Sequence, residues 1–180
     1  CGIGALIYQY FTNMYHHVPS PALMKALMVS GAQWVHSYQY ELMPRFQGMV
    51  SDGWGEVDLI KTIQGTGART TDQLVYYDEQ DSIAMSGATI EYAYTISEED
   101  PGGLKVTLVW TDYPGNPAGA MALVNDLDLI VIKEAGDGYG QYVGNYMLRY
   151  PWGSASMDIG TNSPTPLCDG QNNVEQVIIR

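Results

Sequence analysis

The sequence predicts a mostly β fold, an antiparallel β-sandwich, preceded by a helical region. Two changes along the chain predict this division. Residues 1–63 carry apolar side chains at helical spacing, whereas from about residue 64 short alternating runs recur between turn residues. The 20 Gly, 9 Pro and 14 Tyr among 180 residues also suit a strand-rich chain better than a helical bundle. We therefore expect a helical domain over residues 1–63 and a β domain over residues 64–180.

The helical domain is expected to contain three helices. "IGALIYQYFTNMY", residues 3–15, is apolar on nearly every face and predicts a helix that is buried all round. In "SPALMKALMVSGA", Ser20 is the expected N-cap, Pro21 the first-turn proline and Gly31 the stop. "EVDLIKTI", residues 56–63, predicts a short third helix.

The β domain is expected to follow a polar, Gly-rich linker, "QGTGARTTDQ". Alternation of apolar and polar residues predicts strands in "LVYY", "ATIEYAYTI", "LKVTLVW", "LDLIVI", "QYVGNYML" and "NVEQVIIR". Turn signals such as "EEDPGG" and "TDYPGNPAG" separate them. Several short strands with regular turns are typical of a sandwich or barrel.

The charge of the chain limits its partners. Acidic residues outnumber basic ones 20 to 8, for a net charge of −12, which repels nucleic acids and anionic membranes and attracts cations. Solubility alone explains the acidity equally well. No run approaches the roughly 18 apolar residues of a membrane helix. We expect no nucleic-acid or membrane partner, and we expect Cys1 and Cys168 to be unpaired.

The histidines do not supply an active site. A nucleophilic serine needs a base within hydrogen-bond reach and a third group that orients the base. His16 and His17 are adjacent at the expected end of a helix, and His36 lies in a Tyr- and Gln-rich loop. Their spacing does not suit zinc either. We predict that the chain contains no catalytic residue and has no peptidase activity by itself.

Oxygen-bearing side chains gather at several strand ends, and they predict a calcium site. Calcium prefers six to eight oxygen ligands. Two residues apart on a strand, Asp126 and Asp128 would face the same side. The candidate ligands are Asp126, Asp128, Asp112, Asp169, Asn173 and Glu175. Capping of backbone N–H groups is the alternative for Asp126 and Asp128, and a plain β-turn is the alternative for Asp112.

Three blocks of the chain resemble subtilisin-like serine proteases that carry a C-terminal β-jelly-roll domain. "SPALMKALMVSGA" followed by "GWGEVDLIKTI" is similar to the closing helices of the protease domain, and "CGIGALIYQYF" looks like the later part of the helix that bears the catalytic serine. "LKVTLVWTDYPGNPAGAMALVNDLDLIVI", "QYVGN" and "DGQNNVEQVII" resemble the jelly roll. The Gly-Thr-Ser motif of the family is absent.

The resemblance implies a function for the parent protein. It implies a secreted, extracellular, calcium-dependent serine endopeptidase that acts on peptide or protein substrates. This chain would be its C-terminal part, with an incomplete jelly roll that stabilises the protease domain or helps to place substrate. Its partner would be the remainder of the protease domain or a complementary chain. The alternative is a non-catalytic jelly roll that binds a glycan or a protein surface, for which Tyr150 and Trp152 are the candidate aromatic residues.

Overall fold

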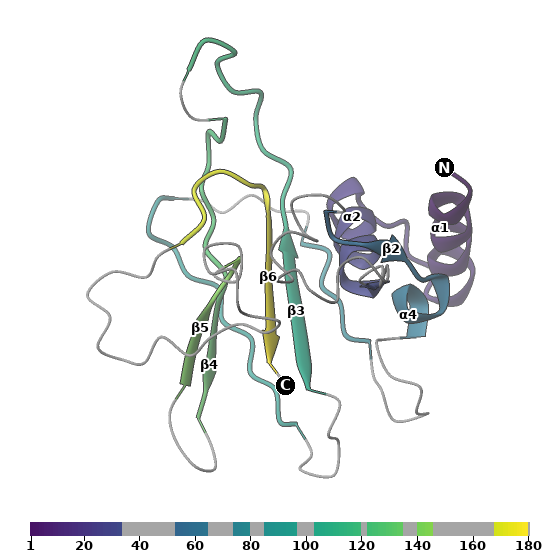
Figure 1. Ribbon diagram of the computed structural model, residues 1–180. Helices are drawn as coiled ribbons and strands as arrows, with labels where there is room; N and C mark the ends of the chain where they lie inside the picture. Colours follow the sequence, from purple (N-terminus) through teal and green to yellow (C-terminus); the bar gives the residue numbers. More distant parts are fainter. Residues whose placement is uncertain are drawn as a thin grey trace, which may run out of the picture.

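The computed structural model describes residues 1–33, 53–64, 74–79, 85–96, 103–119, 122–134, 140–145 and 168–179. A helical unit and a group of extended strands lie side by side (Figure 1). The helical unit contains α1 (Gly2–Met14), α2 (Pro21–Gly31), the short strands β1 (Ala32–Gln33) and β2 (Glu56–Val57), and α4 (Leu59–Gln64). The strand group contains β3 (Leu104–Val109), β4 (Ile130–Lys133), β5 (Gly140–Val143) and β6 (Val174–Ile179).

The described strands form three antiparallel pairs. β1 pairs with β2, β4 pairs with β5, and β3 pairs with β6 in a register that joins Leu104 to Ile179 and Val109 to Val174. Among the described residues each pair is a two-stranded sheet, and the pairs do not close into a barrel. The antiparallel pairing is as predicted, and in the described residues these short sheets are combined with helices.

The start and end of α2 confirm the sequence prediction. The Ser20 side chain accepts a hydrogen bond from the Leu23 N–H at 3.0 Å, Pro21 occupies the first turn, and the helix ends at Gly31. Gly31 is also required by packing, because a Cβ atom there would lie 2.6 Å from the backbone of Thr62 on α4. The third predicted helix begins later than expected: Glu56 and Val57 pair with β1, and Asp58 caps α4 by accepting from the Lys61 N–H.

The helical core forms between one face of α1 and α2. Ile7, Phe11, Leu23 and Leu27 are buried there, and Leu74 and Tyr76 pack against them. These two residues lie beyond the predicted domain boundary. The prediction that α1 is buried all round is wrong for this structure, because Ile7 and Phe11 are the buried residues of α1. Ile3, Leu6, Tyr8 and Met14 are exposed.

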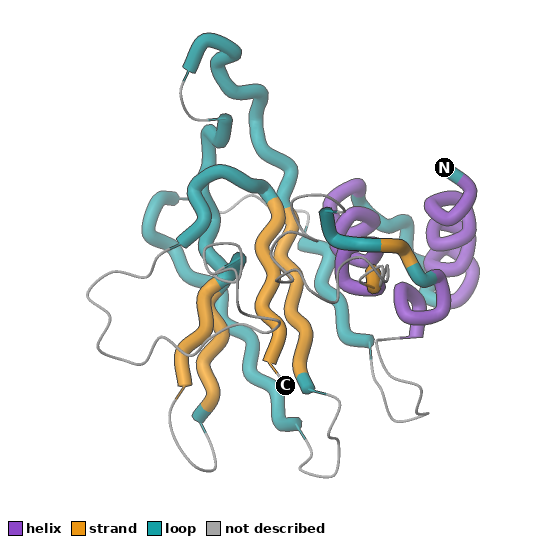
Figure 2. The backbone as a smooth tube through the Cα atoms, in the orientation of Figure 1, coloured by secondary structure: helices purple, strands orange, loops and turns teal. Residues whose placement is uncertain are grey.

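The β-strand predictions hold for some runs and not for others. β3 and β6 lie within the predicted runs, and β4 and β5 overlap theirs but each extend one residue beyond, to Lys133 and Gly140. Residues 74–77 and 88–96 were also predicted as strands, and they form no strand pairing among the described residues. The loop after β3 projects beyond the strand ends (Figure 2). His36, Tyr150 and Trp152 lie outside the described residues.

Candidate cation-binding site

Asp126 and Asp128 lie in a loop rather than on a strand. β4 begins only at Ile130, so the argument that strand alternation aligns the two side chains does not apply. The loop nevertheless brings Asp126 close to the segment before β6, because a Cβ atom on Gly170 would lie 3.2 Å from Asp126 Oδ2. Burial, followed by the neighbouring carboxylates of Asp128 and Asp169, raises the pKa of Asp126.

Asp169 is held by amide groups on the opposite side of this cluster. Its Oδ2 accepts hydrogen bonds from the side-chain amides of Asn145 and Asn172, both at 2.7 Å, and its Oδ1 accepts from the Gln171 N–H at 3.0 Å. These bonds form a compact turn before β6. Both carboxylate oxygens of Asp169 therefore already accept hydrogen bonds from the protein.

Glu175 is the buried member of the cluster. Its side chain extends from β6, the residue is 1% exposed, and its Oε2 accepts from the Leu129 N–H at 2.5 Å. Its other oxygen, Oε1, is buried and has no hydrogen-bond partner. Burial, together with the carboxylates of Asp128 and Asp169, raises its pKa to about 7, against the effect of the backbone N–H groups of Leu129 and Asp169. A buried acceptor without a donor is costly unless a proton or a cation compensates it.

Asp112 caps a loop, which is a different role from the β-turn considered for it. Its Oδ2 accepts from the Val124 N–H at 2.7 Å, and its Oδ1 accepts from the N–H groups of Tyr113 and Asn125 and from the Asn125 side chain. Desolvation opposes ionisation, but these hydrogen bonds outweigh it and lower the pKa of Asp112.

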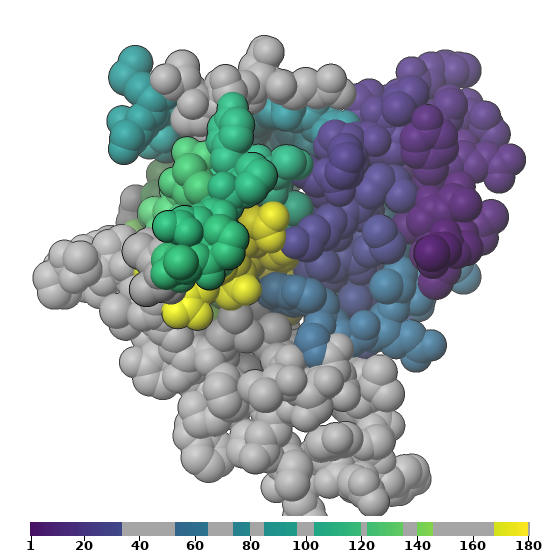
Figure 3. Space-filling model, turned by 90° about the horizontal axis from the view of Figure 1, so that it is seen from above, coloured from purple at the N-terminus to yellow at the C-terminus, as the bar shows by residue number. Residues whose placement is uncertain are grey.

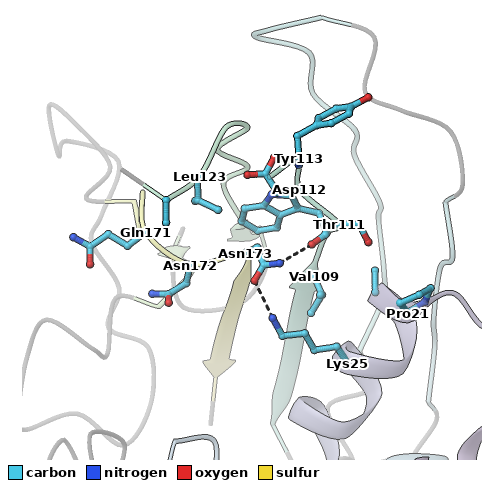
Figure 4. Close-up of a pocket in the computed structure, with 13 residues that line it drawn as sticks. Pro21, Lys25, Val109, Thr111, Asp112, Tyr113, Leu123, Gln171, Asn172 and Asn173 are labelled. Carbon is cyan, nitrogen blue, oxygen red and sulfur yellow. Dashed lines mark hydrogen bonds between the residues drawn. The ribbon is translucent and has the colours of Figure 1, made fainter. Parts of the chain in front are cut away.

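Asn173 connects the strands to the helical unit. Its Oδ1 accepts a hydrogen bond from Lys25 Nζ at 2.8 Å, and its Nδ2 donates to the Trp110 carbonyl at 3.0 Å. Figure 4 shows Asn173 between Lys25 of α2 and the end of β3. Its amide oxygen therefore already accepts a hydrogen bond from the ammonium group of Lys25.

Of the six predicted ligands, the structure brings four together: Asp126, Asp128, Asp169 and Glu175, which we call the acidic cluster. In the view of Figure 3 the yellow C-terminal segment, which carries Asp169 and Glu175, lies between the green loops and the purple helices. Within the described ranges, no three His, Cys, Asp or Glu side chains are arranged as a ready metal site. The four carboxylates are hard oxygen donors of the kind that calcium prefers.

Two residues beside the acidic cluster, Asn145 and Cys168, were not predicted from the sequence as part of the site. Asn145 is 2% exposed and has a positive φ of 56°. Its side chain donates to Asp169 and to the Val174 carbonyl and accepts from the Gln176 N–H. Cys168 lies beside Asp128, and burial together with this contact raises the pKa of its thiol to about 12. It is not joined to Cys1 by a disulfide.

A hydrogen-bonded His–Asp pair is present elsewhere, in the helical unit. His17 Nε2 lies 2.7 Å from Asp78 Oδ2, and the Ser20 N–H donates to the same oxygen at 2.8 Å. The Ser20 hydroxyl faces Asp78 and the Leu23 N–H rather than His17. His17 therefore has no nucleophile to activate in this group, and the pair ties residues 74–79 to the loop between α1 and α2.

The groove between α2 and the loops has a volume of about 480 Å³ and is lined by both units. Lys25 and Pro21 contribute from α2, while Trp110, Asp112 and Asn173 contribute from the strand side. Lys25 and Asn173, which are joined by a hydrogen bond, both line it. None of the helices in the described residues combines the length and the apolar character needed to cross a membrane.

Comparison with known proteins finds one similarity that covers most of the chain. The chain is 30% identical over 164 residues, 90% of its length, to "Serine protease/ABC transporter B family protein tagA" of Dictyostelium discoideum. It spans only 8% of the length of that relative. No family model matches the chain. The chain is thus similar to a part of a protein that is named as a serine protease.

Proposed function

We propose that this chain is the C-terminal part of a secreted, calcium-dependent, subtilisin-like serine endopeptidase. The observation that carries the proposal is the 30% identity, over 90% of the chain, to a protein named as a serine protease. The helices would close the protease domain, and the strands would form a jelly roll that stabilises it or assists the placement of a peptide substrate. The direct hydrogen bonds of Lys25 and Lys105 between the two units support a stabilising role.

Catalysis is proposed to reside outside this chain. Among the described residues no serine hydroxyl is directed at His17, and residues 1–180 are expected to be inert towards casein and towards a fluorophosphonate probe. In the full-length protein the same probe should label one serine outside these residues, identified by mass spectrometry of the labelled peptide. Labelling of any serine within residues 1–180, or no labelling of the full-length protein, would contradict the proposal.

Calcium is proposed to bind at the acidic cluster. All four side chains offer hard oxygen ligands, and the unpartnered Oε1 of Glu175 is a buried acceptor next to two further carboxylates. A bound cation would neutralise the like charges that oppose ionisation of Asp126 and Glu175. Calcium well above its dissociation constant should raise the melting temperature by roughly 5–10 °C relative to chelator.

A matched pair of variants tests the location of this site. Glu175→Gln should abolish the calcium-dependent rise in melting temperature, because it removes the charge while keeping the shape of the side chain. Glu134→Gln makes the same charge change on an exposed residue after β4 and should retain the full rise. An equal response of the two variants would place the ion elsewhere.

A second function, glycan binding by a non-catalytic module, is favoured by one surface feature. The rings of Tyr77 and Tyr92 lie 4.2 Å apart between centroids, and both residues are exposed, as is Tyr94. Exposed aromatic rings can stack on the apolar faces of sugars. Retardation of the protein in gels that contain soluble polysaccharide, with loss of retardation in Tyr92→Ala, would support this function. Equal mobility in all gels would exclude it for the polysaccharides used.

A further inference from the structure

Large apolar side chains lie exposed along residues 88–96, where apolar and polar residues alternate. The Tyr77 ring lies 4.2 Å from the Tyr92 ring and 6.4 Å from the Tyr94 ring between centroids, so Tyr92 and Tyr94 are on the same side of the segment. Two isoleucines continue this row at a spacing of two residues. The exposed members, which we call the tyrosine–isoleucine surface, are Tyr77, Ile90, Tyr92, Tyr94 and Ile96.

The backbone beside this surface is also open to a partner. The Ala88 N–H donates to the Met85 carbonyl at 3.2 Å in a turn. Beyond this turn, no backbone hydrogen bond joins residues 89–96 to any other segment that the structure describes. A row of free N–H and C=O groups next to alternating apolar side chains is a template to which an extended peptide can add as a further strand.

The charges near the surface indicate the kind of peptide that fits. Glu79 and Glu91 are both exposed, and the Tyr92 hydroxyl donates to Glu79 Oε1 at 3.1 Å. The sequence has no Lys, Arg or His in residues 74–79 or 85–96, and the whole chain has a net charge of −12. Electrostatic complementarity therefore favours a cationic peptide and disfavours an anionic one.

The same surface contains the tyrosine pair considered for glycan binding, and two observations favour a peptide. The Tyr77 and Tyr92 rings are inclined by only 30° at 4.2 Å, so they stack on each other and offer fewer free faces to a sugar. Ile90 is 56% exposed and Ile96 is 52% exposed, and these aliphatic groups suit the side chains of a peptide. The open backbone groups likewise match a strand.

We propose that the tyrosine–isoleucine surface binds an extended cationic peptide, which adds as a strand beside residues 89–96. Apolar side chains at alternate positions of the peptide would contact the surface, while its Lys or Arg side chains would lie near Glu79 and Glu91. The inference deepens the proposed role in placing a peptide substrate, and it rests on that role for the source of the peptide. Neither calcium nor the acidic cluster takes part.

A fluorescent peptide that alternates lysine and valine is the probe. Fluorescence anisotropy with the full chain should show binding that weakens as the salt concentration rises. A glutamate–valine peptide should not bind, and a lysine–serine peptide should bind much more weakly. Alternate residues of a strand direct their backbone groups to opposite edges. Methylation of one alternate set of peptide nitrogens should therefore abolish binding, and methylation of the other set should preserve it.

Variants of the protein locate the binding surface. Ile96→Ser should raise the dissociation constant of the lysine–valine peptide about fivefold, because it removes an apolar contact. Glu91→Gln should raise it about threefold and reduce its dependence on salt. Glu134→Gln makes the same charge change on an exposed residue after β4 and should keep the wild-type affinity. In the wild type, the peptide should slow hydrogen exchange of residues 89–96 and leave that of α1 unchanged.

Several results would overturn the proposal. They are no binding of the lysine–valine peptide, equal binding of the glutamate–valine peptide, equal binding of the two methylated peptides, or an unchanged affinity in Ile96→Ser. Retardation by polysaccharide that Tyr92→Ala abolishes, without peptide binding, would assign the surface to a glycan. Protection of residues 89–96 that rises with protein concentration, without peptide, would assign it to a second copy of the chain.

The proposed function is tested separately by labelling of a serine in the full-length protein. Labelling there without peptide binding overturns the peptide surface alone. Peptide binding without any labelled serine overturns the protease function and leaves the peptide surface in place.

Discussion

At the scale of single residues, Gly144 shows how closely the backbone approaches the acidic cluster. A Cβ atom there would lie 2.3 Å from Glu175 Oε2 and 2.7 Å from Glu175 Cβ. The Gly144 N–H donates to the Leu129 carbonyl at 2.8 Å. Gly144→Ala should therefore lower the free energy of unfolding by about 1–3 kcal/mol, as overpacking does. Urea denaturation measures the change. Gly2→Ala, where a Cβ atom meets nothing within 4 Å, is the control. An unchanged midpoint for Gly144→Ala would refute the steric argument.

Asp112 is the residue at which capping and calcium binding can be separated. Four hydrogen bonds from three residues already reach its carboxylate. Asp112→Asn replaces one acceptor oxygen with a donor, which should lower the urea concentration at the midpoint of unfolding. The loss should be the same in calcium and in chelator, as urea denaturation in both buffers will show. A loss seen only in calcium would make Asp112 a ligand, as first predicted from the sequence.

At the scale of elements, Asp78 holds an extended segment against the loop between α1 and α2. Desolvation opposes its ionisation, but hydrogen bonds from Ser20 and His17 outweigh it and lower the pKa of Asp78. A carboxyl group whose pKa is lower in the folded state stabilises the fold above its unfolded pKa of about 4, and this contribution is lost as pH falls through the folded pKa.

The lowered pKa of Asp78 predicts how the stability of an Asp78 variant depends on pH. Asp78→Asn should be less stable than the wild type at pH 7 by about 1–3 kcal/mol, and the difference should shrink as the pH falls below about 4. Thermal or urea denaturation across this range measures it. Glu79→Gln changes the same charge on the next, exposed residue and should show little effect at either end. A difference that is constant across the pH range would exclude ionisation of Asp78 as its source.

The local signals in the sequence predicted elements better than they predicted contacts. Ser20 and Pro21 specify the start of α2 through bonds within one turn, so the sequence alone suffices. Asp126 and Glu175 were expected to share a site because both lie near strand ends; in the structure each is influenced by the charges of Asp128 and Asp169, and whether they share a cation stays a prediction. The roles of Asp112 and Asn173 depend on partners 13 and 148 positions away, which periodicity does not reveal. Asn145 follows Gly144 in "VGN", a pattern typical of an ordinary turn. The neighbouring residues in the sequence do not indicate that the Asn145 side chain is buried.

At the scale of the whole molecule, the helical unit and the strands are joined by two lysines along α2. Lys25, near the middle of the helix, donates to the Asn173 side-chain amide oxygen. Lys105 of β3 donates to the Ser30 carbonyl at 2.8 Å and to the Ala32 carbonyl at 3.4 Å at the C-terminal end of α2. A cation at the C-terminal end of a helix satisfies free carbonyl groups and interacts favourably with the helix dipole. The two units should therefore unfold together.

Removal of the Lys105 contact should separate the two unfolding transitions. In the wild type, pulsed hydrogen exchange along a urea gradient should give coincident midpoints for peptides from α2 and from β6, as a two-state transition requires. In Lys105→Met the Ser30 carbonyl of α2 and the Ala32 carbonyl of β1 lose this donor, at a cost of about 1–2 kcal/mol, and the α2 midpoint should fall below that of β6. Lys133→Met, with the same loss of charge on β4, should keep the midpoints together.

Midpoints that already differ in the wild type would show that the interface does not couple the units. If Lys105→Met leaves both midpoints where they were, then apolar packing of α2 on β3 rather than the lysine holds the units together.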